Sequence, residues 1–194
     1  MKVLVTGGHR GLGQHLAELA QADIISRVDG YDITKDQSRI AELSLEYDVF
    51  VNNAFDGPPH EPWANFGQVN VLQEVYFAWA NANKSGHIIN IGSVGEKSIV
   101  APDPTFETYR VAKAALAHAS RQCTAAFKKG IVPFKTTLIT LDRLDTELSR
   151  SRENWTGNGI DLNDVVDMIR LSLSAKPNTC IEEVVAYVNF GFKP

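Results

Sequence analysis

The chain opens with an apolar segment that leads directly into a cluster of glycines. Residues 2–6 read Lys-Val-Leu-Val-Thr, which is typical of a short buried strand, and Gly7, Gly11 and Gly13 follow it. Glycines at these positions allow backbone amides to approach an anion and allow the next helix to pack closely against the strand. The start of that helix would add free N–H groups and a favourable dipole. The order of strand, turn and helix predicts a phosphate-binding turn in an α/β fold; an ordinary glycine-rich turn without a ligand is the alternative.

Composition and spacing exclude several classes of function. A formal charge of −4, with no basic block, gives no reason to expect nucleic acid or an anionic membrane as a partner. No apolar run is long enough to span a membrane, and the first strand leaves no room for a signal peptide. Cys123 and Cys180 form no CxxC pair, so a cytoplasmic protein is expected. A nucleoside-triphosphatase loop is excluded because Gln14 and His15 stand where that motif needs Lys and Ser or Thr.

Strand and helix patterns alternate along the whole chain without a linker or a repeat. Apolar residues at helical spacing predict helices at residues 11–21, 36–46, 67–81, 107–129 and 162–174. Short apolar runs predict strands at residues 2–6, 23–27, 47–51, 87–91, 136–141 and 180–190. Strands separated by helices predict one domain over residues 1–194, a doubly wound parallel sheet in three α/β/α layers.

One part of this layout is too short for the usual fold. Only four residues lie between Arg27 and Asp32, whereas a crossover between parallel strands needs a dozen or more. We therefore expect one crossover helix, and with it one strand, to be missing between the second strand and the strand that ends in Asn52-Asn53-Ala54.

A tyrosine and a lysine lie four residues apart in the long alanine-rich helix predicted at residues 107–129. This spacing places the phenol of Tyr109 and the ammonium of Lys113 on one helical face. A nearby cation lowers the pKa of a phenol, which makes it a more effective proton donor or acceptor. Such pairs also occur by chance, so the pair gains weight only from the glycine-rich turn at the other end of the chain. Together they suggest redox chemistry on a bound nucleotide.

Five motifs follow one another along the chain: Thr6-Gly7-x-x-x-Gly11-x-Gly13, Asn52-Asn53-Ala54, Asn70, Ser93 and Tyr109-x-x-x-Lys113. This is the order found in the short-chain dehydrogenases/reductases, and the chain resembles the compact, reductase-like members of that family. The likeness runs from residue 1 to about residue 150 and continues more faintly to the end. It implies a Rossmann-like domain that binds a nicotinamide dinucleotide.

The resemblance implies four catalytic residues. Tyr109 would be the general acid/base, and Lys113 would lower its pKa and hold the nicotinamide ribose. Ser93 would hydrogen-bond the substrate carbonyl, although a plain turn serine is the alternative; a serine-hydrolase elbow fails because Ile91 replaces its first glycine. Asn70 would support a water that links Lys113 to solvent, unless it only bonds a neighbouring strand.

The resemblance also implies a set of cofactor contacts. Asp32 and Ile33 resemble the family's adenine-contacting pair, with a helix-capping turn before Asp36 as the alternative. Thr146 would bind the nicotinamide carboxamide, although the Pro-Gly pair that usually precedes it is absent, and Phe55 replaces the glycine that usually follows Ala54. The full set of expected contacts is Gly7, His9, Arg10, Gly11, Leu12, Gly13, Arg27, Asp32, Ile33, Asn53, Ala54, Tyr109, Lys113 and Thr146.

Charges near the second strand favour NADP(H) over NAD(H), although NAD(H) stays possible. An acidic residue at the end of that strand would grip the ribose hydroxyls and repel a 2′-phosphate. The predicted strand ends instead at Arg27, and Arg10 adds a second cation in the glycine-rich turn. Two guanidinium groups suit a phosphate. Asp29 is the counter-argument, since the shortened loop leaves the register open.

We therefore expect an NADPH-dependent oxidoreductase that reduces a carbonyl, or oxidises an alcohol, of a small molecule. A non-catalytic NAD(P)-binding regulatory protein and a lyase or isomerase that uses the same residues are the alternatives. Specificity should come from residues 55–63, 97–106 and 148–159, with residues 149–158 as a possible lid. The scattered histidines give no metal-ligand spacing. Because relatives pair through the long helix, a homodimer or homotetramer is expected.

Overall fold

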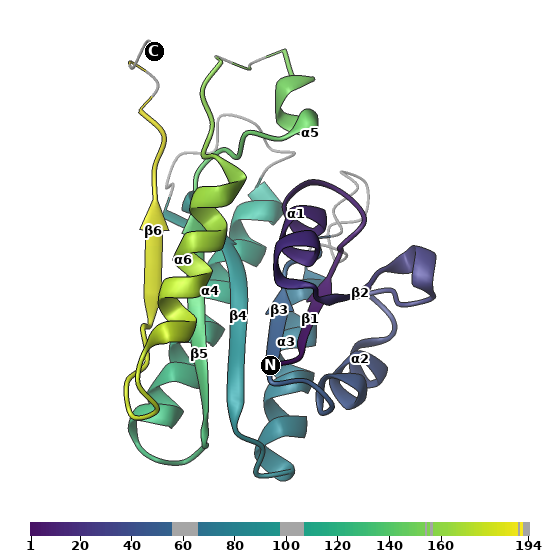
Figure 1. The fold of residues 1–194 in the computed structure, drawn as a ribbon, viewed down its shortest axis with the longest axis vertical. Helices are drawn as coiled ribbons and strands as arrows, with labels where there is room; N and C mark the ends of the chain where they lie inside the picture. The colour runs from purple at the N-terminus through teal and green to yellow at the C-terminus, as the bar shows by residue number, and fades with distance from the viewer. Residues whose placement is uncertain (56–65, 98–106, 154, 156, 190, 192–194) are drawn as a thin grey trace.

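Six parallel strands form one sheet in the order β2-β1-β3-β4-β5-β6 (Figure 1). This computed structural model describes residues 1–55, 66–97, 107–153, 155, 157–189 and 191. The strands are β1 (Val3–Thr6), β2 (Asp23–Ile25), β3 (Val49–Asn52), β4 (Gly86–Ser93), β5 (Phe134–Leu141) and β6 (Glu183–Ala186). The prediction of a doubly wound parallel sheet is confirmed.

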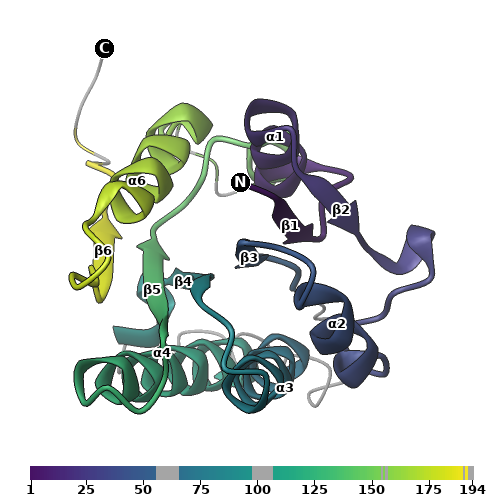
Figure 2. The ribbon, with the colours of Figure 1, turned by 60° about the horizontal axis from the view of Figure 1, so that its bottom comes forward.

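Helices cover both faces of the sheet, so the predicted three layers are present (Figure 2). The α-helices are α1 (Gly11–Ala20), α2 (Gln37–Ser44), α3 (Gly67–Asn81), α4 (Glu107–Lys128), α5 (Glu147–Arg150) and α6 (Leu162–Ser174). Helices α2, α3 and α4 pack on one face, and α1 and α6 pack on the other. The short α5 was not predicted. No helix among the described residues is long and apolar enough to cross a membrane.

Alternation along the central strands builds two separate cores. Leu4, Phe50 and Ile88 pair in register across β1, β3 and β4, and all three are fully buried against α2, α3 and α4. Their sequence neighbours, such as Val5 and Val51, point to the opposite face and pack against α1 and α6. Because successive side chains of a strand point to opposite faces, a strand buried on both sides must be apolar throughout. This explains the continuous apolar runs in the sequence.

The sheet is shortened where the residue count predicted it. Strand β2 ends at Ile25, and Arg27–Asp29 form a 3-10 helix, η1, in place of the expected end of the strand. Helix α2 then leads to β3, which pairs with β1 on the side opposite β2. Among the described residues β2 is the last strand at this edge of the sheet. The carboxyl ends of the strands meet at one edge, where ligands of such sheets bind.

Candidate active site

The glycine-rich turn between β1 and α1 has the geometry of an anion cradle. Gly7 and Gly11 have φ of 74° and 57°, in the left-handed region that favours glycine. A Cβ on Gly13 would lie 2.1 Å from the carbonyl oxygen of Gly7, so only glycine lets the helix approach the turn this closely. Arg10 is the N-cap of α1 and makes no side-chain cap hydrogen bond, which leaves the first N–H groups of the helix for another acceptor.

Thr6 and Asn53 hold this turn in shape. The Thr6 hydroxyl accepts hydrogen bonds from the backbone N–H of Asn53 at 3.0 Å and of Ala54 at 2.9 Å. The Asn53 side-chain amide donates to the carbonyl oxygens of Thr6 at 2.9 Å and Gly7 at 3.3 Å. The Asn53 side chain, expected to contact the cofactor, therefore bonds the turn itself.

The hydroxyls of Ser93 and Tyr109 meet at the carboxyl end of β4. Ser93 is the last residue of β4, and Tyr109 lies in the first turns of α4. Both side chains border Gly95, where an added Cβ would lie 3.3 Å from Ser93 Oγ and 3.5 Å from Tyr109 Cε1. The backbone N–H of Gly95 also donates to the Ser93 hydroxyl at 3.2 Å, which fixes its orientation. Burial raises the pKa of Tyr109, while the bond with Ser93 and the charge of Arg152 act in the opposite direction. The phenol is therefore protonated at neutral pH.

Lys113 lies beneath this pair but does not lower the pKa of Tyr109 as the sequence suggested. Its side chain is buried, and its Nζ donates to Gln68 Oε1 at 2.8 Å and to the Ile91 carbonyl at 2.9 Å. Burial lowers the pKa of Lys113 to about 7. Its Nζ is 5.8 Å from the centre of the Tyr109 ring and 5.1 Å from that of Phe55. Desolvation of both groups outweighs the expected attraction.

Gln68 is the residue of α3 whose side chain contacts Lys113, whereas the role expected for Asn70 was an indirect one through a water. Gln68 is 2% exposed, and its side chain also donates to the Asn52 carbonyl at 2.6 Å. Asn70 is exposed. Residues two positions apart in a helix are separated by about 200° around its axis, so Asn70 points away from the face that Gln68 buries.

The Asn52 side chain ties this arrangement to the sheet. Its amide donates to the Gln68 carbonyl at 2.9 Å and to Asn90 Oδ1 at 3.0 Å. Asn90 in turn donates to the Ser120 hydroxyl of α4 at 3.3 Å. A buried chain of polar groups therefore links α3, two central strands and α4 below the candidate catalytic residues, and it fixes where Lys113 lies.

The other predicted cofactor contacts differ in how far their side chains are exposed. Leu12 and Ile33 are buried in the two cores, so their side chains are not available to a ligand. Asp32 accepts from the N–H and the hydroxyl of Thr34, in the capping turn considered as its alternative role. Arg10 and Arg27 are exposed, in the glycine-rich turn and in η1 respectively.

The loop after β5 closes over the glycine-rich turn. Thr146 is the N-cap of α5, where its hydroxyl accepts from the Ser149 N–H at 3.2 Å. Its methyl group would be 3.9 Å from a Cβ on Gly11, so Thr146 borders the turn without the Pro-Gly pair. A pocket of about 300 Å³ lies between the two segments and is lined by Gly11, Gln14, His15, Glu18, Asp145, Thr146, Glu147, Arg150 and Leu162.

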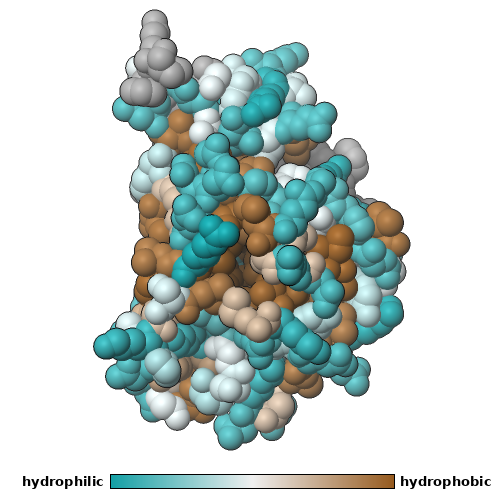
Figure 3. Space-filling model, viewed as in Figure 1, coloured by the Kyte–Doolittle hydropathy of each residue, from teal (hydrophilic) through white to brown (hydrophobic). Residues whose placement is uncertain are grey.

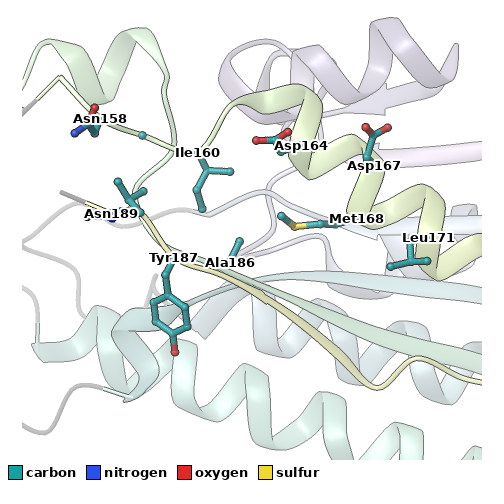
Figure 4. Close-up of a pocket in the computed structure, with 11 residues that line it drawn as sticks. Asn158, Ile160, Asp164, Asp167, Met168, Leu171, Ala186, Tyr187 and Asn189 are labelled. Atoms are coloured by element: carbon teal, nitrogen blue, oxygen red, sulfur yellow. The ribbon is translucent and has the colours of Figure 1, made fainter. Parts of the chain in front are cut away.

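A larger cavity of about 700 Å³ lies elsewhere, between α6 and the segment around β6 (Figure 4). Met168, Leu171 and Ala186 give it apolar walls, and Asp164 and Asp167 lie at its edge. The lining of this cavity includes none of the candidate catalytic residues Ser93, Tyr109 and Lys113. The same side of the molecule exposes apolar side chains in the hollow between α6 and α1 (Figure 3).

Several residues expected in the substrate pocket lie outside the described part of the chain. These are His60, Glu61, Trp63 and Phe106, with most of the two loops that contain them. Phe55 is described, and its ring meets the Tyr109 ring edge-on at a centroid distance of 5.0 Å. Where the family usually has a glycine, this chain therefore places an aromatic ring next to Tyr109. Part of the possible lid is the helix α5.

Comparisons with known proteins give structural neighbours but no sequence relatives. No protein-family model matches the chain, and a search of curated proteins found no match. A short-chain dehydrogenase from Streptomyces avermitilis has a TM-score of 0.74 at 20% identity, covering 96% of this chain and 88% of its own. One from Burkholderia cenocepacia, in complex with NADP, has a TM-score of 0.69 at 21% identity, covering 95% and 89%.

A third neighbour is the 3-ketoacyl-(acyl-carrier-protein) reductase from Brucella melitensis, complexed with NADH. Its TM-score is 0.70 at 18% identity, and the match covers 95% of this chain and 96% of that one. The neighbours are thus short-chain dehydrogenases and reductases over nearly the whole chain. The TM-scores and the near-complete coverage lead to one conclusion: this chain has the fold of the short-chain dehydrogenases and reductases.

Proposed function

We propose that residues 1–194 form one nicotinamide-dinucleotide-binding domain that reduces a carbonyl group, or oxidises an alcohol, of a small molecule. The observation that carries this proposal is that the Ser93 and Tyr109 side chains lie close together, on either side of Gly95, at the carboxyl end of β4. Two convergent hydroxyls can hold a carbonyl oxygen and supply it with a proton. The neighbours with the same fold, which are dehydrogenases and reductases by their names, support the same reaction class.

The residues of the turn fit a dinucleotide phosphate. The close approach of Gly13 to Gly7 leaves no room for a Cβ, and the uncapped start of α1 offers N–H groups to an anion. Gly7, Gly11 and Gly13 would hold the pyrophosphate, and Thr146 would face the nicotinamide end. When bound, the nicotinamide would supply or accept the hydride. The rest of the chemistry belongs to the protein.

Tyr109 would transfer the proton. Its raised pKa keeps the hydroxyl protonated at neutral pH, so it is ready to donate to the carbonyl oxygen during reduction. Ser93 would hold the same oxygen through a second hydrogen bond and fix its position. Lys113, whose pKa lies near neutrality, would take part in returning the proton to Tyr109. Gln68 would hold Lys113 in place.

NADP(H) is the proposed cofactor, with NAD(H) possible. Arg10 and Arg27 lie in the two segments that flank the expected adenosine ribose, and their charge suits a 2′-phosphate. The neighbours include one chain in complex with NADP and another with NADH, so the fold itself accepts either.

We further propose a cytoplasmic homodimer or homotetramer. Both cysteines are free thiols, which suits a reducing compartment. On α4 the exposed side chains recur at helical spacing, which is the pattern of a helix face that can pair with another chain. These residues are Val111, Ala114, His118, Gln122 and Ala125.

The reaction is tested by following absorbance at 340 nm with NADPH and a panel of carbonyl compounds. We expect Tyr109→Phe to lower kcat about 100-fold or more, because the phenylalanine cannot donate a proton. Tyr187→Phe is the matched control, since Tyr187 is 65% exposed and is not part of the site. Calorimetry should give both variants the same affinity for NADPH within about twofold. An unchanged kcat in Tyr109→Phe would exclude this mechanism. If the wild type binds NADPH but turns over no carbonyl compound of the panel, a regulatory protein would be favoured.

A further inference from the structure

One side chain of the glycine-rich turn reaches the segment that follows β2. His9 Nε2 lies 2.8 Å from Asp29 Oδ2, and the Ser26 hydroxyl donates to the same oxygen at 2.9 Å. Ser26 also accepts from the Val28 N–H, which ties it to η1. One carboxylate oxygen is therefore held by two side chains, one from each of two separate segments.

The pair lies beside the expected adenosine ribose. The Gly7 N–H donates to the carbonyl of Ile25, the last residue of β2, at 2.8 Å, so the turn and the start of η1 are in direct contact. In dinucleotide-binding sheets the acidic residue about 20 positions beyond the turn bonds the ribose hydroxyls. Asp29 stands at that place in the sequence, in η1 directly after β2. Its pKa is lowered, first by the hydrogen bond from His9, so it is an anion at neutral pH.

We infer that His9 determines the choice between NADP(H) and NAD(H), by holding the Asp29 carboxylate so that a 2′-phosphate can be accommodated; this inference rests on the proposed function. A carboxylate without such partners would accept hydrogen bonds from the ribose hydroxyls and repel a phosphate. His9 and Ser26 already donate to Oδ2, which reduces both effects. Arg10, next in sequence, adds to the positive charge of the same turn.

The first experiment measures the dissociation constants of NADPH and NADH by calorimetry for four proteins. These are the wild type, His9→Ala, Asp29→Asn and the double variant. We expect His9→Ala to weaken NADPH binding about tenfold, as for loss of a partly exposed charged hydrogen bond, and to leave NADH binding within about twofold. Asp29→Asn should remove the need for His9, so the double variant should bind NADPH as tightly as Asp29→Asn does.

Two further variants separate the causes. His9→Gln keeps a donor for Asp29 but cannot carry a charge, so it should retain most NADPH affinity if the hydrogen bond is what matters. His118→Ala is the matched control, because His118 is exposed on α4, which packs on the opposite face of the sheet from α1. It should leave both dissociation constants unchanged.

The outcomes distinguish this inference from the proposed function. If neither dinucleotide binds the wild type at millimolar concentration, the proposed function fails. If both bind, and His9→Ala weakens them equally or the two substitutions act additively, only the role of His9 is overturned. Thermal unfolding of each variant identifies any that lose affinity merely by unfolding.

Discussion

A buried lysine is the most unusual residue of this molecule. Lys113 is 5% exposed and donates its hydrogen bonds only to neutral groups, so its charged form is disfavoured in the folded state. Proteins rarely keep such a group unless it serves the chemistry. Its Nζ lies 5.8 Å from the centre of the Tyr109 ring.

The lowered pKa of Lys113 predicts how stability changes with pH. The unfolded chain binds this proton up to about pH 10.5, whereas the folded chain releases it near 7. The stability that depends on the neutral amine is therefore present above pH 10.5 and is lost as the pH falls toward 7. Between pH 7 and 10 the free energy of unfolding of the wild type should rise by roughly 1 kcal/mol per pH unit relative to Lys113→Met. Urea unfolding at several pH values measures this; parallel curves for the two proteins would contradict it.

The neighbouring helix gives a second prediction, which decides between two residues of α3. Gln68→Met keeps the volume of the side chain but removes its hydrogen bond to Lys113, so kcat should fall about tenfold or more while KM changes little. Asn70→Ala, on the exposed face of the same helix, should leave kcat within about twofold. Gln68→Asn, which keeps an amide, should recover part of the loss. If Asn70→Ala is the damaging change, the assignment drawn from the structure is wrong.

At the scale of single residues, Asn70 and Gln68 show how much of a site can be predicted from a sequence. The sequence pointed to Ser93, Tyr109 and Lys113 because their motif has fixed spacing on a predicted strand and helix; their catalytic role stays a prediction. Gln68 has no motif, but the buried residues Val71, Leu72, Val75 and Trp79 continue one helical face back to it. A polar residue on an apolar helical face was the available signal. The direction of the pKa shift of Tyr109 could not be foreseen, because it depends on burial.

At the scale of elements, strand β4 carries a buried histidine, His87, that makes the stability of the sheet depend on pH. His87 Nε2 lies 2.8 Å from the Thr137 hydroxyl of β5, and that hydroxyl donates to the Ile181 carbonyl. Because the hydroxyl has a single hydrogen, His87 Nε2 must be the donor. Burial lowers the pKa of His87 to about 4, so the folded protein requires the neutral ring.

Acid should therefore destabilise the sheet at His87. The stability that depends on the neutral ring is fully present above pH 6.5, the ordinary histidine value, and is lost as the pH falls to about 4. The loss should approach about 3 kcal/mol. His87→Gln keeps a donor for Thr137 but does not titrate, so its stability should change less over this range. His118→Gln, at an exposed position of α4, is the control and should behave as the wild type.

An ion cluster joins three elements behind the site. Arg121 of α4 bonds Glu183 of β6 at 3.1 Å and Glu96 at 3.3 Å, and Glu96 belongs to the 3-10 helix Val94–Lys97 that follows Ser93. Glu96 is almost wholly buried, and burial raises its pKa. For Glu183, burial would raise the pKa, but the hydrogen bonds from Thr140 and Arg121 lower it. The cluster therefore fixes the turn after Ser93 against the helix that carries Tyr109.

Removal of the arginine should expose the repulsion between the two carboxylates. We expect Arg121→Met to reduce the free energy of unfolding by about 1 to 3 kcal/mol at pH 7, since a partly buried charge loses its partner. Adding Glu96→Gln to this variant should restore much of the loss, because one of the two like charges is then gone. Urea unfolding of the single and double variants gives the coupling; strictly additive effects would show that the cluster contributes little.

At the scale of the whole molecule, the alternation of strands and helices predicted the sheet, and a count of residues predicted its shortened edge. Both follow from geometry that every α/β chain must obey. Element ends were less predictable. Strand β2 stops two residues early because Ser26 caps η1, and α5 is only one turn long and has no apolar periodicity to reveal it.

The state of association is the remaining prediction at this scale. Sedimentation at micromolar concentration should give a dimer or a tetramer. Ala114→Arg would place a long charged side chain in the proposed pairing face of α4 and should shift the protein toward the monomer. Leu171→Arg makes the same change on α6, beside the larger cavity, and so tests the other apolar surface. A wild type that is only monomeric would remove the proposal.

The bonds from Thr6 and Asn53 have a consequence for how a nucleotide would associate. They connect the glycine-rich turn to its own neighbours, so the amides that would meet a phosphate are already aligned before any ligand arrives. Binding then requires little ordering of the backbone, and less of the interaction energy is consumed by lost chain entropy. A turn whose amides are aligned in advance would therefore hold a phosphate group at a lower entropic cost than a turn that has to order on binding.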